Sequence, residues 1–368
     1  MSMLDSNRTP APDAAPAGPD AGGTTPEPGG ERAVTGRDPG PARLGPPRLG
    51  PARLGPGQRL VLVGALAAAA SCCLLFLFIR GSFAFAIDQR LAMLGTMLVV
   101  AFTQGVGTVV FHTVTHNRIL TPSIMGFDSL YTFMQTILVW VFGGVFLASV
   151  EGIPKLIAET LLMVVFATLL YRWLFSGRFG SLYVLLLVGV VLGMAFDSIS
   201  VFVQRLLNPT DYDMLSVELM GRMSSVDSDY LPLAFAVCAA VGLVLWRRRF
   251  RLDVLLLGRD AAQNLGIDHK RELTVMLVLI AVMVAFSTAL AGPMTFFGFV
   301  VATLAYQVAG THRHQYVMPM AFLLGLLTLT AGQFVLEHVF YASGFLTVII
   351  EFAGGTLFLL LLLRKGKL

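Results

Sequence analysis

Glu351 is an acidic residue inside a stretch that is otherwise almost entirely apolar, Phe345–Leu363. If this stretch crosses a bilayer, a charge near its centre costs about 2.5 kcal/mol or more, so the carboxylate needs a partner or a function. Gly354 and Gly355 follow three and four residues later, on the same face of a helix. Because small residues mark contacts between membrane helices, we expect Glu351 to point into a helix bundle. There it either lines a path or bonds to a neighbouring helix.

Asp197 is a second acid of this kind, in the apolar stretch Leu182–Leu207. It continues the face of Gly189 and Gly193, whose spacing is that of a GxxxG helix contact. The pattern predicts a packed interface and makes these residues candidates for the substrate path or for helix packing. In an alternative interpretation, an ion-coupled transporter uses Glu351 and Asp197 to relay a proton or a cation.

The chain lacks the residue patterns that would let it catalyse a reaction by itself. It has no G-x-x-x-x-G-K-S/T phosphate loop, and no pair of acids with a nearby histidine suggests hydrolysis. His112/His116 and His312/His314 have spacings that suit a metal, but no cluster of cysteines or carboxylates accompanies them. We therefore predict no metal site, no bound cofactor and no enzyme activity. The energy for any transport has to come from another protein.

A polar segment, Trp246–Glu272, interrupts the apolar part of the chain. Its centre begins with Asp260, which favours a helix N-terminus, and ends with Gly266, which stops a helix. The small side chains of Ala261 and Ala262 would let such a short helix lie closely in a groove of another protein. The alternative is an ordinary surface helix within a loop.

The elements that must position these residues are long apolar stretches. The 368-residue chain has 13% charged residues and a mean hydropathy of +0.76, whereas soluble domains carry about 25% charged residues. Ten stretches have lengths suited to a bilayer, and the absence of alternation predicts helices, not barrel strands. The eighth is too short to cross alone unless the His and Thr residues beyond it continue the helix. The predicted spans are Leu60–Ile79, Leu91–Val110, Leu130–Phe146, Ile157–Phe175, Leu182–Leu207, Leu231–Trp246, Leu273–Leu290, Phe296–Val308, Tyr316–Leu336 and Phe345–Leu363.

The basic residues give these spans an orientation. An even number of spans puts both termini on one side of the membrane. On this topology only five of the 26 Lys and Arg residues lie on the opposite side: Arg80, Arg90, Lys155, Arg205 and Arg222. Because Lys and Arg concentrate on the cytoplasmic side, we predict a multi-pass protein of the cytoplasmic (inner) membrane with both termini in the cytoplasm.

Residues 1–59 differ in composition from everything that follows. They hold 12 of the 18 prolines and many glycines, and such a segment cannot bury a core. We predict a disordered cytoplasmic tail, residues 1–59, followed by a membrane domain, residues 60–368. The tail ends in a tandem repeat, PARLG-PPRLG-PARLG, which is either a basic linker against anionic lipid or a neutral spacer.

Three segments resemble the FecCD-type iron-chelate permeases. Asp260–Gly266 resembles the E-A-A-x-x-x-G motif of the coupling helix in ABC importer permeases, with Asp in place of Glu. Thr115–Tyr131 is similar to an N-P-L-A-x-P-x-x-L-G region that follows the second span, although Arg118 stands where the first Pro is common. Ala291–Val301, AGPMTFFGFVV, resembles A-G-P-I-x-F-V-G-L-V-V. The resemblance covers nearly all of residues 60–368.

The resemblance implies an all-α integral membrane protein of about ten transmembrane helices, with the architecture of a type II ABC importer permease. It implies a permease subunit that moves ferric siderophores, with catecholates as one candidate class, by alternating access. The implied partners are a second and different permease subunit, two copies of an ATPase that uses ATP and Mg, and an extracytoplasmic siderophore-binding protein, with no role for nucleic acid. The residues that it assigns to the ATPase-coupling helix are Arg259, Asp260, Ala261, Ala262, Leu265 and Gly266.

The same resemblance makes Arg90 a candidate for docking the binding protein. Related permeases carry an arginine near the start of the second span that pairs with a glutamate of that partner, and Arg90 in IDQRLAM is the matching position. The acidic loop Asn208–Tyr230 either contacts the same partner or is only solvated.

Overall fold

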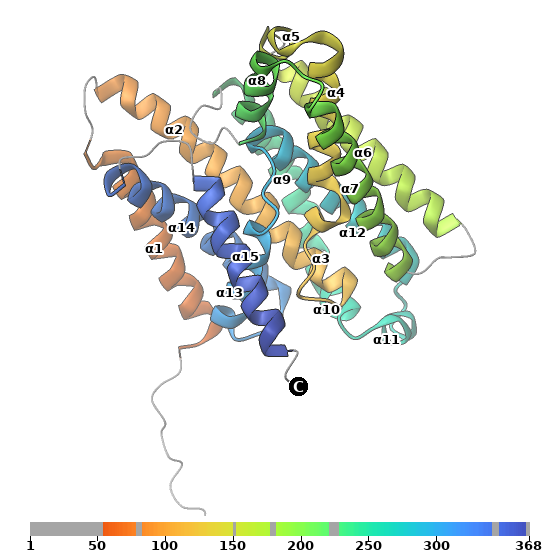
Figure 1. Ribbon diagram of the computed structural model, residues 1–368. Coiled ribbons are helices and arrows are strands. Elements are labelled where there is room, and N and C mark those ends of the chain that lie inside the picture. Colours follow the sequence, from red (N-terminus) through yellow and green to blue (C-terminus); the bar gives the residue numbers. More distant parts are fainter. Residues whose placement is uncertain are drawn as a thin grey trace, which may run out of the picture. The chain divides into compact units, whose positions relative to one another are not determined.

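The computed structural model describes residues 54–78, 83–149, 152–176, 182–220, 228–340 and 346–365, and all regular elements in these ranges are helices (Figure 1). The all-α prediction is confirmed. The elements are α1 Pro56–Phe76, α2 Phe83–Val100, the π-helical segment η1 Ala101–Val106, α3 Gly107–Thr115, the 3₁₀ turn η2 Pro122–Met125, α4 Phe127–Phe142, α5 Gly144–Ser149, α6 Ile153–Ser176, α7 Leu182–Gln204, α8 Pro209–Leu219, the 3₁₀ turn η3 Ser228–Tyr230, α9 Leu231–Arg247, α10 Arg249–Leu255, α11 Arg259–Asn264, α12 His269–Ala291, α13 Phe297–Ala309, α14 His314–His338 and α15 Leu346–Lys365.

Apolar helices occupy the positions of all ten predicted spans. Among the described residues, seven helices are long and apolar enough to cross a membrane, and α2, η1 and α3 form one of them, continuous from Phe83 to Thr115. Three shorter apolar helices, Phe127–Phe142, Phe297–Ala309 and Leu346–Leu360, fill the remaining positions. The chain is therefore a multi-pass helical membrane protein.

Glycines with positive φ end the helices at the third and the eighth predicted spans. The third was expected to reach Phe146, but α4 ends at Phe142 because Gly143 turns the chain with φ 84°. The eighth does not continue through the His and Thr residues beyond it, since Gly310, with φ 63°, ends α13. At 1.5 Å per residue, the 13 residues of α13 span about 20 Å, less than the ~30 Å hydrocarbon core.

The first helix begins earlier than expected. Residues 1–53 of the predicted tail lie outside the described residues, but Pro56–Arg59 already belong to α1. Pro56 takes the first helical position, where its fixed φ suits a helix start. The backbone N–H of Gly55 donates to Gln58 Oε1 at 3.0 Å, which satisfies one group that the helix start leaves open.

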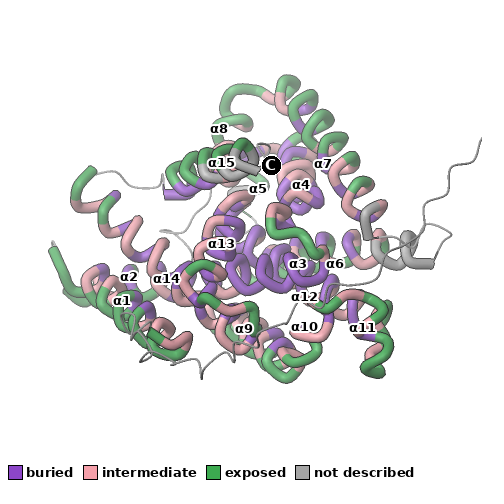
Figure 2. Tube along the Cα trace, turned by 90° about the horizontal axis from the view of Figure 1, so that it is seen from below, coloured by how far each residue is buried: buried purple, intermediate pink, exposed green. Residues whose placement is uncertain are grey.

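The buried core lies along the central helices and not at the periphery. In the most apolar window of Phe83–Thr115, 83% of residues are buried, against 17% in α1 and in Ser228–Arg247. Figure 2 shows this contrast, with α3, α12 and α13 mostly buried and the outer faces of α1, α9 and α7 exposed. Exposed apolar side chains on membrane-length helices are what contact with lipid requires. The short segments α10 and α11 lie at the same end of these helices as the end of α3, opposite α5 and α8 (Figure 1).

Candidate functional site

The predicted short helix in the polar loop is present as α11. Gly258, with φ 94°, precedes it, and Gly266, with φ 80°, follows it. Both φ values lie in the region that glycine adopts without strain. The N–H of Ile267 donates to the carbonyl of Ala262 at 3.0 Å and closes the helix C-terminus. The backbone therefore bounds α11 on both sides and presents it as a separate unit between α10 and α12.

The two alanines of α11 have different environments, which the sequence did not reveal. Ala262 is fully buried in the main core cluster of this chain, so it does not lie on a surface that another protein could contact. The expectation that both alanines enter a partner's groove is wrong for Ala262. Apolar surface comes instead from Leu257 and Leu265, whose side chains are 64% and 62% exposed on either side of the helix.

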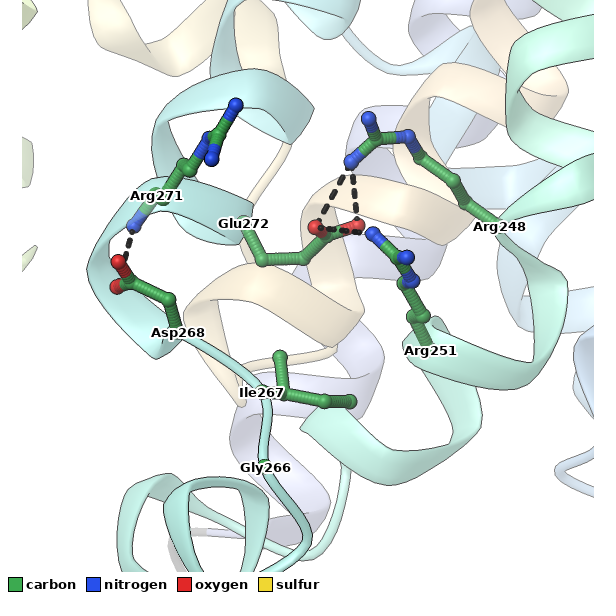
Figure 3. A pocket seen from close by; sticks show the side chains of 7 residues that line it. All are labelled: Arg248, Arg251, Gly266, Ile267, Asp268, Arg271 and Glu272. Atoms are coloured by element: carbon green, nitrogen blue, oxygen red, sulfur yellow. Dashed lines mark hydrogen bonds and ion pairs between the residues drawn. The ribbon is translucent and has the colours of Figure 1, made fainter.

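A buried carboxylate clamps the two ends of this loop together. Glu272, in the first turn of α12, accepts two hydrogen bonds of 2.8 Å from Arg248 Nη1, between α9 and α10 (Figure 3). Arg251 approaches the same carboxylate at 3.4 Å. The Glu272 side chain is only 5% exposed, so the pair fixes where the loop leaves and re-enters the helices. The residues around the adjacent cavity of about 360 Å³ are Arg248, Arg251, Gly266, Ile267, Asp268, Arg271 and Glu272.

A histidine joins the same loop to the central helices. His314, the first residue of α14, has Nδ1 2.6 Å from Asp253 Oδ1 on α10 and Nε2 2.7 Å from Thr113 Oγ1 on α3. Burial raises the pKa of the Asp253 carboxyl, but the hydrogen bonds from His314, with the charges of His314 and Arg313, outweigh burial and lower it below its usual value. Asp253 is therefore held as a carboxylate that connects α10 to α14.

Two acids meet at the connection between α12 and α13. Asp128, in the first turn of α4, accepts a hydrogen bond of 2.9 Å from Thr295 Oγ1 and one of 3.4 Å from Thr288 Oγ1. Glu351 on α15 accepts the backbone N–H of Phe296 at 3.1 Å, immediately before α13. Of the two roles left open for Glu351, a bond to a neighbouring helix start is therefore present in the structure. A carboxylate at a helix N-terminus is favourable because the free N–H groups point at it.

Asp197 and its glycines lie where α7 crosses the start of α4. A Cβ on Gly126 would lie 3.0 Å from Gly193 Cα and 3.1 Å from the carbonyl oxygen of Gly189, so the two backbones are in direct contact. Asp197, exposed on α7, accepts a hydrogen bond of 2.9 Å from Ser129 Oγ. The glycines therefore serve helix packing, and the carboxylate beside them is exposed on the surface of this chain.

Arg90 is buried and already satisfied within the chain. Its Nη1 donates to the carbonyls of Leu74 and Leu77 at 2.9 and 2.8 Å, at the end of α1, and its Nη2 lies 3.4 Å from Glu337 Oε1. Arginine at a helix C-terminus satisfies the last free carbonyls. Docking by Arg90 stays a prediction, and it would require the guanidinium to leave these acceptors.

The histidines of the loop end do not gather into a metal centre. Within the described residues, no three His, Cys, Asp or Glu side chains are placed to hold a metal ion. His116 instead lies 3.0 Å from the carbonyl of Leu255 through Nε2, and His312 lies 3.3 Å from Arg118. The first contact joins α10 to the end of α3, and the second joins the segment after α3 to the segment after α13.

Residues 59–364 match the sequence model of the FecCD transport family. The chain belongs to the FecCD transport family. The petrobactin import system permease protein FatC of Bacillus anthracis is 39% identical over 78% of this chain and 81% of its own length. The petrobactin import system permease protein YclO of Bacillus subtilis is 37% identical over 81% of this chain and 95% of its own length. A solved structure, described as a metal-chelate type ABC transporter in an inward-facing conformation, has a TM-score of 0.70 at 20% identity and covers 84% of this chain and 100% of its own. That likeness supports the fold.

Several residues that hold the loop to the helices were not singled out from the sequence. Arg248, Asp253, Glu272 and His314 link the loop to the helices. From the sequence, His314 was named only as half of a pair with metal-like spacing and Glu272 only as the end of the polar segment. The available signal was an acid in the first turn of an apolar helix, Glu272, opposite the arginine run at Arg247–Arg251. That pairing was open to prediction. The pairing of Asp253 with His314, 61 residues apart, was not.

Proposed function

We propose that this chain is a permease subunit of an ATP-binding-cassette importer that carries ferric siderophores across the cytoplasmic membrane. The observation that carries the proposal is the 39% identity over 78% of the chain to a petrobactin import permease, within a family match that spans residues 59–364. Petrobactin is therefore the first substrate to test, ahead of other siderophores. The permease has no catalytic role, and a separate ATPase uses ATP and Mg.

The ATPase binds at α11 and its flanking leucines. Leu257 and Leu265 expose apolar surface on either side of α11, which is bounded by glycines and lies at one end of the membrane helices. Arg248–Glu272 and Asp253–His314 fix this segment to α12 and α14, so a displacement of α11 is passed to helices that form the core. This arrangement supports the coupling role proposed for Arg259–Gly266.

The transport path forms between this chain and a second, different permease subunit. Asp197 supports this part of the proposal, because it is an exposed carboxylate on a membrane-length helix, and such a charge faces an aqueous path or a protein partner and not lipid. A binding protein delivers the chelate on the side of α5 and α8, and both termini are cytoplasmic, as the five Lys and Arg residues on the opposite side indicate.

The proposal is tested by uptake of iron-labelled chelates into cells with and without the gene. We expect uptake of ferric petrobactin to require this chain and an ATPase, with a catecholate and a hydroxamate as comparison chelates. Uptake that proceeds without any ATPase partner and follows the proton gradient would contradict the proposal and favour the ion-coupled alternative. Co-purification of the tagged chain with a nucleotide-binding subunit gives the same distinction without a substrate.

A further inference from the structure

The cavity beside Glu272 is rich in arginine and has more positive charge than its own acids neutralise. It measures about 360 Å³ and lies between the end of α9, α10 and the start of α12. Arg248 is committed to Glu272, whereas Arg251 reaches that carboxylate only at 3.4 Å with a side chain that is 58% exposed. Within the described part of the chain, the Arg271 guanidinium has no acceptor. Three arginines face two acids, so the cavity favours an anion.

We propose that this cavity binds the phosphate of an anionic phospholipid headgroup from the membrane leaflet on the loop side. Guanidinium groups recognise phosphate oxygens through paired hydrogen bonds, which a single ammonium cannot reproduce. Arg251 and Arg271 border the cavity from two different elements, α10 and α12, and Figure 3 draws them on either side of the Glu272 side chain. A free phosphate ion offers the same oxygens, so the source of the phosphate is decided by where the cavity lies.

The location favours a lipid. The cavity is formed where two membrane-length helices, Ser228–Arg247 and His269–Ala291, end and begin. Trp246 and Phe250 do not line the cavity but are close in sequence to Arg248 and Arg251, which do. They are 44% and 58% exposed, and Arg249 lies over both rings at 4.6 and 4.4 Å. Exposed aromatic rings of this kind are typical of the membrane interface, and basic pockets between transmembrane helices bind acidic headgroups. A headgroup in the cavity leaves its acyl chains beside apolar helix surface, which a free ion cannot use.

A lipid bound in the cavity also affects how the ATPase is coupled to the membrane helices, a consequence that rests on the proposed function. Glu272 borders the cavity and clamps the loop that carries α11, so a bound anion attracts Arg251 away from that carboxylate and changes how firmly the loop is held. The lipid then modulates the link between ATPase and membrane helices. The binding itself does not depend on what the protein transports.

Trp246 makes the binding measurable. The sequence has three tryptophans, so the full-length chain with Trp140→Phe and Trp173→Phe keeps Trp246 as the only reporter, two residues from Arg248. In phosphatidylcholine nanodiscs, we compare quenching by bromine-labelled phosphatidylglycerol with quenching by bromine-labelled phosphatidylcholine at equal mole fraction. We expect the anionic lipid to quench at a several-fold lower mole fraction. The pocket variant Arg251→Gln/Arg271→Gln should lose this preference, while Arg247→Gln, which removes a charge one residue from Arg248 but outside the cavity lining, should keep it.

Each other outcome overturns the proposal. Equal quenching by both lipids means that no anionic lipid collects near Trp246. A preference that persists in the pocket variant, or disappears in Arg247→Gln, means that general boundary charge attracts the lipid and the cavity does not. A preference abolished by millimolar inorganic phosphate means that the ligand is a soluble anion. Because no step measures transport, failure here leaves the siderophore proposal standing, and failure of siderophore uptake leaves this result unaffected.

Discussion

His314 holds one carboxylate oxygen of Asp253 from two of its own nitrogens, at 2.9 Å from the backbone N–H and 2.6 Å from Nδ1. The backbone bond satisfies a free donor at the start of α14, as an N-terminal cap does, although the acid comes from another helix. Nε2 of the same ring lies 2.7 Å from Thr113 Oγ1. One imidazole therefore joins α10, α14 and α3, and any movement of the loop reaches two core helices at once.

Removal of this junction should uncouple ATP hydrolysis from transport. We expect Asp253→Asn to leave ATPase activity of the assembled importer in place and to lower uptake per ATP by about 2- to 30-fold, the range that 0.5–2 kcal/mol of coupling energy gives. The measurement is ATP hydrolysis and chelate uptake in the same proteoliposomes. His312→Ala serves as the control, since His312 contacts Arg118 and not α10. Unchanged uptake per ATP in Asp253→Asn would remove the junction from the coupling path.

The Asp253 carboxylate should also contribute to the pH dependence of the stability of the folded protein. The pKa of Asp253 is lowered in the folded protein, despite burial, by its hydrogen bonds and charge contacts with His314 and Arg313. A depressed pKa stabilises the fold above the unfolded value of about 3.9 and loses that contribution as pH falls through the folded value. Thermal unfolding in detergent should therefore show a constant gap between wild type and Asp253→Asn from pH 7 down to about 4. The gap should shrink at lower pH, and a gap that widens there would contradict the assignment.

Removal of one partner of the Arg248–Glu272 pair should destabilise the protein more than replacement of both partners. Glu272 is 5% exposed and Arg248 is 29% exposed, so removal of one partner leaves a largely buried charge. We expect Arg248→Gln to lower the free energy of unfolding by about 1–3 kcal/mol, less than for a fully buried pair because Arg248 stays partly solvated. The double variant Arg248→Gln/Glu272→Gln should recover part of that loss. A double-mutant cycle with additive effects would show that the pair does not interact.

The sequence predicted elements better than it predicted contacts, and the reasons are physical. Apolar length determines which segments can cross a membrane, so the helix positions could be read directly. The stop at Gly266 could be read because a glycine after good helix formers ends a helix. The burial of Ala262 could not be read, since a six-residue helix has too few turns to show which face is apolar. The acceptors of Arg90 could not be read either, because Glu337 lies 247 residues away in the chain.

The buried and exposed residues of α11 should respond to substitution in opposite ways. Leu265→Asp should weaken association with the ATPase without loss of the folded permease, because its side chain is 62% exposed and contacts no core. Ala262→Arg should instead destabilise the chain, since a fully buried methyl group leaves no space for a charge. Co-purification of the ATPase and thermal unfolding distinguish the two effects. Leu265→Met is the matched control that keeps apolar surface, and it should retain the partner.

Gly126 and Gly143 separate backbone strain from close helix packing. Gly126 has φ 90° and ψ 12°, the left-handed region, where alanine costs about 1–2 kcal/mol. Gly143 has φ 84° and ψ 156°, a region that is essentially restricted to glycine, where alanine costs about 1–3 kcal/mol. A Cβ at Gly143 meets nothing within 4 Å, whereas a Cβ at Gly126 lies 3.0 Å from Gly193 Cα. Gly126→Ala must therefore also push α4 away from α7, whereas Gly143→Ala bears backbone strain alone, and we expect both to reduce the free energy of unfolding. Chemical denaturation in detergent measures both variants, and a loss for Gly126→Ala no larger than the about 1–2 kcal/mol of left-handed strain would mean that the contact between Gly126 and Gly193 yields without cost.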